Sequence, residues 1–314
     1  MAEFFTATVR GLSQGSVYVM LGLGFVIIYR ATQVVNLAAP AIMVFGGTIT
    51  SMAVIGQGWP FALAVLLGIL ATAALGAFME RLVMRPMVGE PPFSATMVTV
   101  GILIVMTQVV NKMLGVQDRQ IGLPLSDRSD QLNIGGEVVG TTADGLPIYL
   151  RSVTIFHREL LQLAVVVVVV AGLMAYFKWS RSGIAMRATA LDQEVALAQG
   201  VNVGRMFGLS WAIAGALSAL AGVMVAAGQQ GALGRTTAFV ALKSLPAIIL
   251  GGLDSVGGAV VGGFVIGLAE AYTKIYQPES LGANFDQVVP YLVMMLVLLV
   301  RPYGLFGTPE VERV

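Results

Sequence analysis

The amino-acid sequence predicts an all-α membrane protein, a polytopic bundle of about eight transmembrane helices with additional half-helices. The first observation is composition: 57% of the 314 residues are hydrophobic and 11% are charged, whereas soluble domains carry about 25% charge. The second is a series of apolar runs about 20 residues long, the length that crosses a bilayer core. The third is a pair of similar segments, one in each half of the chain, that combine proline with paired glycine.

The apolar runs give the order of the elements within one transmembrane domain, residues 1–314. We expect spans near 8–29, 34–57, 60–80, 94–114, 159–178, 206–228, 257–275 and 286–300, and a half-helix at 240–252. The first run lacks the basic start and small-residue cleavage site of a secretory signal peptide, so we expect it to be retained as a span.

The basic short loops set the expected orientation. The loops "ERLVMRPM" and "KWSRSGIAMR" are separated by two spans, and we place both in the cytoplasm because short cytoplasmic loops are rich in lysine and arginine. The long polar segment 115–158 then lies outside, where its turn residues and short alternating runs predict a small hairpin-like loop. The same count places Met1 outside and "RPYGLFGTPEVERV" inside.

The two interrupted segments, "VVNLAAPAIMVFGG" and "FVALKSLPAIILGG", run in opposite directions by this count, which indicates an inverted repeat. Interrupted helices at matching points of inverted halves are typical of a transporter's central site, because freed backbone groups need a cavity instead of lipid. The alternative is that proline and glycine only kink packed helices. The predicted translocation path contains Asn36, Pro40, Lys243 and Pro246, and the predicted helix breaks are Gly46, Gly47, Gly251, Gly252 and Asp254.

Two further features lie near the second segment. A lysine at membrane depth is costly, so Lys243 should face a cavity, a carbonyl cluster or the interface, where it could meet a solute carboxylate. The spacings Gly258-x-x-x-Gly262 and Gly263-x-x-x-Gly267 predict close helix packing. Asp254 is expected to cap or orient the break.

The segment 180–205 predicts a docking helix on the cytoplasmic side. Residues 184–199 contain neither proline nor glycine and end at Gly200, a suitable helix C-cap. One face is apolar, consisting of Ile184, Ala188, Leu191, Val195 and Ala198. The polar residues are mixed to acidic, which favours a protein partner over anionic lipid headgroups. The candidate coupling residues are Arg187, Asp192, Glu194, Gly200 and Asn202.

Several kinds of chemistry have no sequence signature here. The chain has no G-x-x-x-x-G-K-[ST] phosphate loop, no H-E-x-x-H zinc motif, no cysteine, and one histidine, His157, in the polar loop. We therefore expect no catalytic residue, no metal site and no cofactor in this chain. A net charge of +1 argues against a nucleic-acid partner.

Across nearly its whole length the sequence resembles the membrane permease subunit of the ATP-binding-cassette importers for branched-chain amino acids. The resemblance is carried by "RGLSQGSVYVMLGLG", "ERLVMRP", "RSGIAMRATALDQEVALAQGVNV", "LKSLPAIILGGLDSVGGAVVGGFVIGLAEAY", "RPYGLFG" and "PEVERV", in this order. It implies a second homologous permease subunit, two cytoplasmic ATPase subunits that bind ATP and magnesium, and an extracytoplasmic solute-binding protein. It also implies that 180–205 is the coupling loop and that the location is the bacterial plasma membrane.

The chain departs from the family pattern at both interrupted segments. The family commonly has Asn-Phe-Ala, then His or Gln, then Gly-Glu, where this chain reads "NLAAPA". In the second segment, the family usually has a small residue where this chain has Pro246, and glycine where it has Asp254. The solute is therefore left open, with branched-chain amino acids first and other amino acids, amides and urea relatives behind. A stand-alone secondary transporter or channel is the alternative function, and a membrane enzyme is a third.

Overall fold

The computed structural model of the protein describes residues 2–115, 131–134, 137–141, 147–150, 153–228, 232–234, 237–278, 280, 282 and 284–308. Its helices are α1 (Ala2–Thr32), α2 (Ala39–Ser51), α3 (Phe61–Met79), α4 (Pro92–Leu114), α5 (His157–Trp179), α6 (Arg181–Leu191), α7 (Gln193–Ala198), α8 (Val203–Ala227), α9 (Thr237–Leu242), α10 (Ser244–Gly251), α11 (Val256–Tyr276) and α12 (Val289–Val300). A π-helical turn, η1 (Met52–Gly56), extends α2; a second, η2 (Glu80–Met84), and a 3₁₀ turn, η3 (Arg85–Met87), extend α3.

Seven helices of the described chain are long and apolar enough to cross a membrane, namely α1, α2, α3, α4, α5, α8 and α11, with α2 and α3 counted together with their turns. The expected eighth span, 286–300, is instead the 12-residue α12 after a short 3₁₀ turn, η5 (Phe285–Gln287). At about 1.5 Å per residue, α12 reaches about 18 Å, less than the roughly 30 Å bilayer core. The expected half-helix at 240–252 is present as the two short helices α9 and α10.

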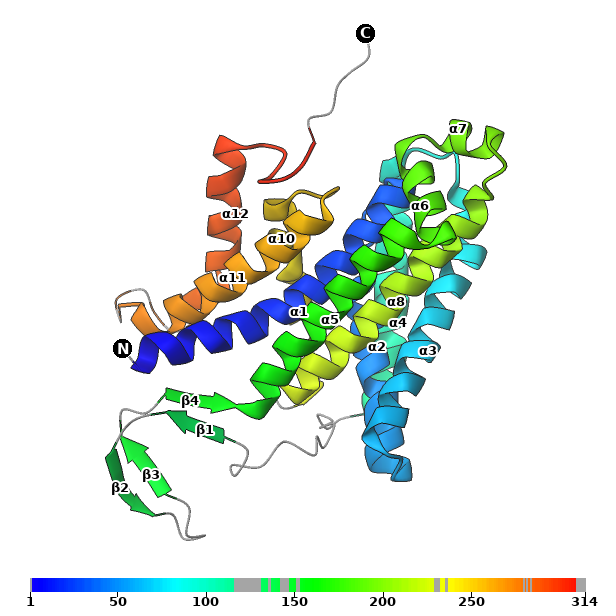
Figure 1. Ribbon diagram of the computed structural model, residues 1–314. Helices are drawn as coiled ribbons and strands as arrows, with labels where there is room; N and C mark the ends of the chain where they lie inside the picture. Colours follow the sequence, from blue (N-terminus) through cyan, green and yellow to red (C-terminus); the bar gives the residue numbers. More distant parts are fainter. Residues whose placement is uncertain are drawn as a thin grey trace.

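The centre of the bundle is formed by α1, α8 and α2. In the most apolar stretch of each helix, 89% of the residues of α1, 72% of α8 and 67% of α2 are buried, against 11% of α5. Figure 1 shows α1 between the group that contains α11 and α12 and the group that contains α3, α4 and α8. The outer helices α3, α4 and α5 expose many large apolar side chains, which suits contact with lipid.

Glycines set the closest helix contacts, as their spacing predicts. Gly263 and Gly267 of α11 face Gly15 and Gly11 of α1 so closely that a Cβ atom on either α11 glycine would overlap α1 backbone. Gly262, one residue earlier than Gly263, instead faces α10. The two Gly-x-x-x-Gly spacings thus pack α11 on both α1 and α10.

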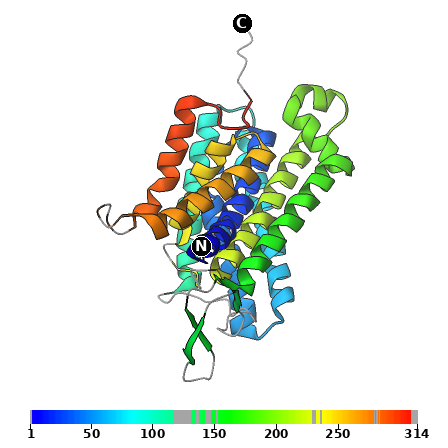
Figure 2. The same cartoon turned by 60° about the vertical axis from the view of Figure 1, so that its left-hand side comes forward.

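The two ends of the bundle carry different structures (Figures 1 and 2). At the lower end, β1 (Gln131–Ile134) pairs antiparallel with β4 (Val153–Phe156), and β2 (Glu137–Thr141) pairs antiparallel with β3 (Pro147–Leu150). This nested pairing matches the hairpin-like fold expected within 115–158. The helices α6 and α7 lie at the opposite end, so the loop and the 180–205 segment are separated as the spans predict.

Candidate functional site

The segment between α1 and α2 leaves the helical conformation before the first proline. Asn36 is buried, and its side-chain Oδ1 accepts a hydrogen bond from the backbone N–H of Ala38 at 3.1 Å. The hydroxyl of Thr99 on α4 donates to the carbonyl of Val35 at 3.0 Å and accepts from the N–H of Leu37 at 3.1 Å. These contacts fix a non-helical turn in the interior of the bundle, with Asn36 at its centre.

Both prolines lie in the first turn of a helix. Pro40 is the second residue of α2, and Pro246 is the third residue of α10. The N–H groups of a first turn have no intrahelical partner, so proline removes no hydrogen bond there. The expectation that the prolines interrupt continuous helices is therefore wrong. The interruptions come earlier, at residues 33–38 and at Lys243, and the prolines begin the helices that follow.

The two proline segments nevertheless meet. They face each other across one small cavity of about 10 Å³, lined by Leu21 and Phe25 of α1, by Asn36, Leu37, Ala39 and Pro40, and by Leu242, Ser244, Leu245 and Ile248. This space suits about one water molecule. The structure thus brings together two segments that are about two hundred residues apart in the chain, in a conformation closed to any larger solute.

Lys243 lies between α9 and α10 and is neutralised within the chain. Its Nζ atom lies 2.8 Å from Oε1 of Glu270 on α11, and the side chains of this ion pair are largely buried, at 16% and 9% exposed. The other oxygen, Oε2, accepts a hydrogen bond from the hydroxyl of Tyr18 at 2.6 Å. Gln14 in turn donates to that hydroxyl at 3.1 Å. Sequence reasoning missed Glu270, although a lone acidic residue in an apolar helix is itself a signal for a buried partner.

The helix break expected at the second glycine pair is present. Helix α10 ends at Gly251, and Gly252 has φ of 109°, a conformation that favours glycine. The C-terminal segment 301–308 satisfies the end of α10: the N–H of Leu305 donates to the carbonyl of Leu250 at 2.8 Å, and the N–H of Phe306 donates to Gly251 at 3.0 Å.

Asp254 fixes the same C-terminal segment. Its carboxylate accepts hydrogen bonds from the backbone N–H of Thr308, at 3.3 Å to Oδ2, and from the Thr308 hydroxyl. Asp254 therefore orients the region after the break by holding the segment that ends at Thr308. The helix that follows, α11, is capped by Ser255, whose hydroxyl accepts a hydrogen bond from the N–H of Gly258 at 3.0 Å.

The first glycine pair does not break its helix. α2 continues through Gly46 and Gly47 to Ser51. A Cβ atom on Gly46 would overlap Ala219 of α8, and one on Gly47 would lie 3.1 Å from the backbone of Gly222. The expected break is wrong here because these glycines are needed for close contact with α8, which the helical conformation of α2 permits without strain.

Where one helix was expected at residues 184–199, in the predicted coupling loop, the structure has two. α6 ends at Leu191, Asp192 is extended, and α7 begins at Gln193. The side chain of Asp192 accepts from the N–H of Val195 at 3.0 Å, which makes it the N-cap of α7. Because aspartate is a strong N-cap, it favours a new helix start at a position where the apolar pattern alone predicts continuity.

The remaining coupling candidates have clear local roles or free side chains. Gly200 has φ of 82°, and the N–H of Val201 donates to the carbonyl of Ala196 at 3.0 Å, so α7 ends in the expected glycine C-cap. Asn202 caps α8 by accepting from the N–H of Arg205 at 2.9 Å. Arg187 and Glu194 are exposed.

Four large apolar side chains of this segment are exposed. Met186 and Thr189 of α6 and Ala196 of α7 are buried. In contrast, the apolar residues Ile184, Leu191, Val195 and Leu197 are exposed, at 48%, 86%, 56% and 58%. We call these four residues the exposed apolar patch. Three of them belong to the face expected from the sequence, and the structure shows that nothing in the described chain covers it.

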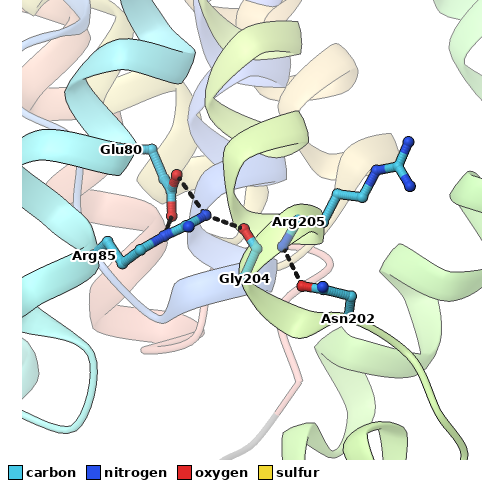
Figure 3. A network of polar contacts seen from close by, with 5 residues as sticks. All are labelled: Glu80, Arg85, Asn202, Gly204 and Arg205. Carbon is cyan, nitrogen blue, oxygen red and sulfur yellow. Dashed lines mark hydrogen bonds and ion pairs between the residues drawn. The ribbon is translucent and has the colours of Figure 1, made fainter.

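An ion-pair network connects this region to α3 (Figure 3). Arg85 binds the buried carboxylate of Glu80 through two hydrogen bonds of 3.2 Å, and its Nη2 also donates to the carbonyl of Gly204 in the first turn of α8 at 3.0 Å. Arg205 lies next to this network, but its side chain points away from it. Sequence reasoning used "ERLVMRP" for the orientation and for the family resemblance, and missed the network.

A cavity lies beside the Glu80–Arg85 pair. It measures about 80 Å³, and Glu80, Trp211 of α8 and Gln193 of α7 are among its lining residues. The side-chain amide of Gln193 also donates to the carbonyl of Ala31 near the end of α1 at 3.3 Å. The start of α7 thus contacts the end of α1 and the same cavity as the end of α3, so α7 cannot move without changing these contacts.

Comparison with known proteins places this arrangement in a family. Residues 7–298 match the family described as the branched-chain amino acid transport system / permease component. The chain belongs to this family. The permease is 30% identical to the high-affinity branched-chain amino acid transport system permease protein LivH of Escherichia coli, over 97% of this chain and 96% of that protein.

Two other relatives are similar over most of their length. The permease is 30% identical to the corresponding protein BraD of Pseudomonas aeruginosa, over 98% of this chain and 96% of BraD. It is 25% identical to a probable branched-chain amino acid transport permease protein of Methanocaldococcus jannaschii, over 92% and 88% of the two chains. The matched region includes both proline segments and the coupling segment, and the seven long apolar helices make the permease a multi-pass membrane protein.

Proposed function

We propose that this chain is the membrane-spanning subunit of an ATP-driven importer for branched-chain amino acids in the bacterial plasma membrane. The family and its relatives support a permease role. The single structural observation that carries the ATP-driven part is the exposed apolar patch on α6 and α7, at the end of the bundle opposite the strands. The neighbouring exposed charges are mixed, with Arg181 and Arg187 beside Asp192 and Glu194. The surface therefore lacks the cationic excess that suits anionic lipid, and a protein surface fits it better.

The proposed partners follow from this role. Two ATPase subunits bind ATP and magnesium, and one of them receives α6 and α7 of this chain. A second homologous permease completes the membrane pore, and a solute-binding protein delivers the amino acid at the end that carries β1–β4. This chain contributes no catalytic residue to ATP hydrolysis. Its contribution is to transmit movement of α7 to α1 through Gln193, and movement of α8 to the end of α3 through Arg85.

The translocation step requires the two proline segments to separate. The cavity between them, at about 10 Å³, is far too small for an amino acid, so the structure is closed at this level. Movement of the first turn of α10 away from the turn around Asn36 opens a path lined by polar groups of both segments. Alternating access then amounts to opening this point toward one side of the membrane at a time.

A copurification and uptake experiment tests the proposal. The tagged chain, expressed in its native cells, should copurify an ATPase and support leucine uptake that isoleucine and valine inhibit and vanadate abolishes. Leu191→Glu with Val195→Glu should abolish ATPase copurification, whereas Gln199→Glu, at an exposed polar position one turn away, should not. Vanadate-insensitive uptake without an ATPase would instead establish the alternative, a stand-alone transporter or channel.

A further inference from the structure

A cluster of polar side chains joins α1, α11 and the α9–α10 junction. Lys243 and Glu270 form its ion pair at 2.8 Å, and Tyr18 and Gln14 extend it along α1 with bonds of 2.6 and 3.1 Å. Tyr18 is 1% exposed and Glu270 is 7% exposed. The cluster therefore lies inside the protein, at membrane depth, where every unpaired charge is costly.

The position of Lys243 makes the ion pair sensitive to movement of α10. Lys243 is the one residue between α9 and α10. Its neighbours on either side, Leu242 and Ser244, line the small cavity opposite Asn36 and Pro40. The bond to Glu270 thus ties one wall of the closed cavity to α11, and α11 is held on α1 by the glycine contacts. When the pair is intact, α10 is held in the closed position.

The chemistry of the pair matches that of a zwitterion. A solute with one carboxylate and one ammonium group could place its carboxylate on Lys243 and its ammonium on Glu270, which leaves no charge unpaired. A solute with a single charge would free one partner and leave it buried without compensation, which is strongly unfavourable. Tyr18 keeps the Glu270 carboxylate oriented during this exchange, because its hydroxyl donates to Oε2, the oxygen that Lys243 does not bind.

We propose that the Lys243–Glu270 pair, oriented by Tyr18, is a latch that a zwitterionic amino acid opens by competing for both of its charges. The inference rests on the proposed function and extends it. It assigns specificity for the amino acid's charged groups to Lys243 and Glu270, and it makes Tyr18 a positioning residue. The latch keeps ATP hydrolysis low until a solute of the right charge pattern reaches the ion pair.

The test uses the full complex in nanodiscs, with ATPase activity measured with and without solute. The double variant Lys243→Met with Glu270→Met removes both charges and leaves neither unpaired, so the complex should assemble. Its ATPase rate without solute should rise by about tenfold, within the usual range of coupling between sites. The charge exchange Lys243→Glu with Glu270→Lys should restore a low rate. Lys274→Met, which removes an exposed lysine from α11, the helix of Glu270, should leave the rate unchanged.

Solute analogues test the charge pattern. In the wild-type complex, leucine at millimolar concentration should stimulate ATP hydrolysis, whereas leucinamide, a cation, and 4-methylpentanoate, an anion, should not. Equal stimulation by the three compounds, or an unchanged solute-free rate in the double variant, would overturn the latch. If the double variant does not assemble, Tyr18→Phe decides the question, since it keeps the ring and must still raise the solute-free rate. A wild-type chain that copurifies no ATPase would overturn the proposed function itself.

Discussion

Arg85 binds both carboxylate oxygens of Glu80 at 3.2 Å and reaches across to the carbonyl of Gly204 at 3.0 Å. One guanidinium group thereby joins the end of α3 to the start of α8, directly after α6 and α7. The Glu80 side chain is 3% exposed and that of Arg85 is 46% exposed, so the network has one buried end and one end near solvent. Because α8 follows α7 in the chain, the network is a candidate for transmitting movement between α8 and α3.

Removal of Arg85 should therefore affect stability and coupling together. Arg85→Gln leaves the Glu80 carboxylate buried without its charged partner and should cost about 2 kcal/mol of stability. Thermal unfolding of the purified complex measures this loss, and solute-stimulated ATPase activity should fall with it. Glu80→Gln with Arg85→Gln should recover part of the stability. Arg205→Gln removes an equal charge at a side chain directed away from the network, and a similar loss in that variant would contradict a specific role for Arg85.

The close contact between α1 and α11 should tolerate no side chain at position 267. Gly267→Ala would place a Cβ atom against the carbonyl of Gly11 and the backbone of Gly15, and we expect destabilisation of about 3 kcal/mol or more. The matched control is Gly257→Ala in the same helix, because a Cβ atom there meets nothing within 4 Å. The yield of folded protein in size-exclusion chromatography distinguishes the two, and equal yields would show that α11 does not pack this closely.

The C-terminal segment should loosen when Asp254 loses its acceptor oxygens. Asp254→Ala removes the partner of the Thr308 N–H and hydroxyl groups, and chymotrypsin should then cleave more rapidly after the exposed Tyr303 and Phe306. Asp254→Asn retains one acceptor oxygen and should fall between Asp254→Ala and the wild type. Limited proteolysis followed by mass spectrometry gives the rates. The role of Asp254 as an anchor is refuted by identical rates in all three proteins.

The cap of α7 predicts a local effect on the coupling segment. Asp192→Ala removes the side-chain acceptor for the N–H of Val195 and should weaken this short helix by about 1 kcal/mol. Hydrogen exchange measured by mass spectrometry should show faster exchange in residues 193–199, with weaker ATPase coupling. Asp192→Asn should preserve the cap, and Glu194→Gln should leave exchange unchanged. Faster exchange in the Asn variant as well would indicate that charge, not capping, is what matters.

The orientation in the membrane is open to direct labelling, because the chain has no cysteine of its own. A cysteine at Val153 in β4 should react with an impermeant maleimide in intact spheroplasts. A cysteine at Glu194 in α7 should react only after the membrane is permeabilised. The opposite pattern would invert the predicted topology. Asp130, another position in the predicted outer loop, lies outside the residues that the structure describes.

Local features of the sequence were sufficient for much of the fold. Apolar runs of membrane length identify the seven long helices, because the lipid environment imposes its own length and composition. Gly200 and Gly252 could be assigned as helix ends, since glycine favours the positive φ values found there. The Gly-x-x-x-Gly spacings of α11 predict close packing for the same local reason. The inverted repeat stays a prediction.

Only the tertiary structure decided how the polar and special residues are used. Proline is compatible both with a kink and with the first turn of a helix, so the positions of Pro40 and Pro246 depended on where the preceding chain leaves its helix. The sequence predicts a helix break at Gly46 and Gly47, but in the structure α2 continues through them, and they allow its close contact with α8. The partner of Lys243 is 27 residues away on another helix, and no local pattern encodes that pairing. The sequence by itself identified the seven long apolar helices, because hydrophobicity is a property of each segment, but it also predicted a span at 286–300, where the shorter α12 lies. The tertiary structure determined which charges meet and which apolar face stays exposed, because those depend on packing between segments distant in the chain.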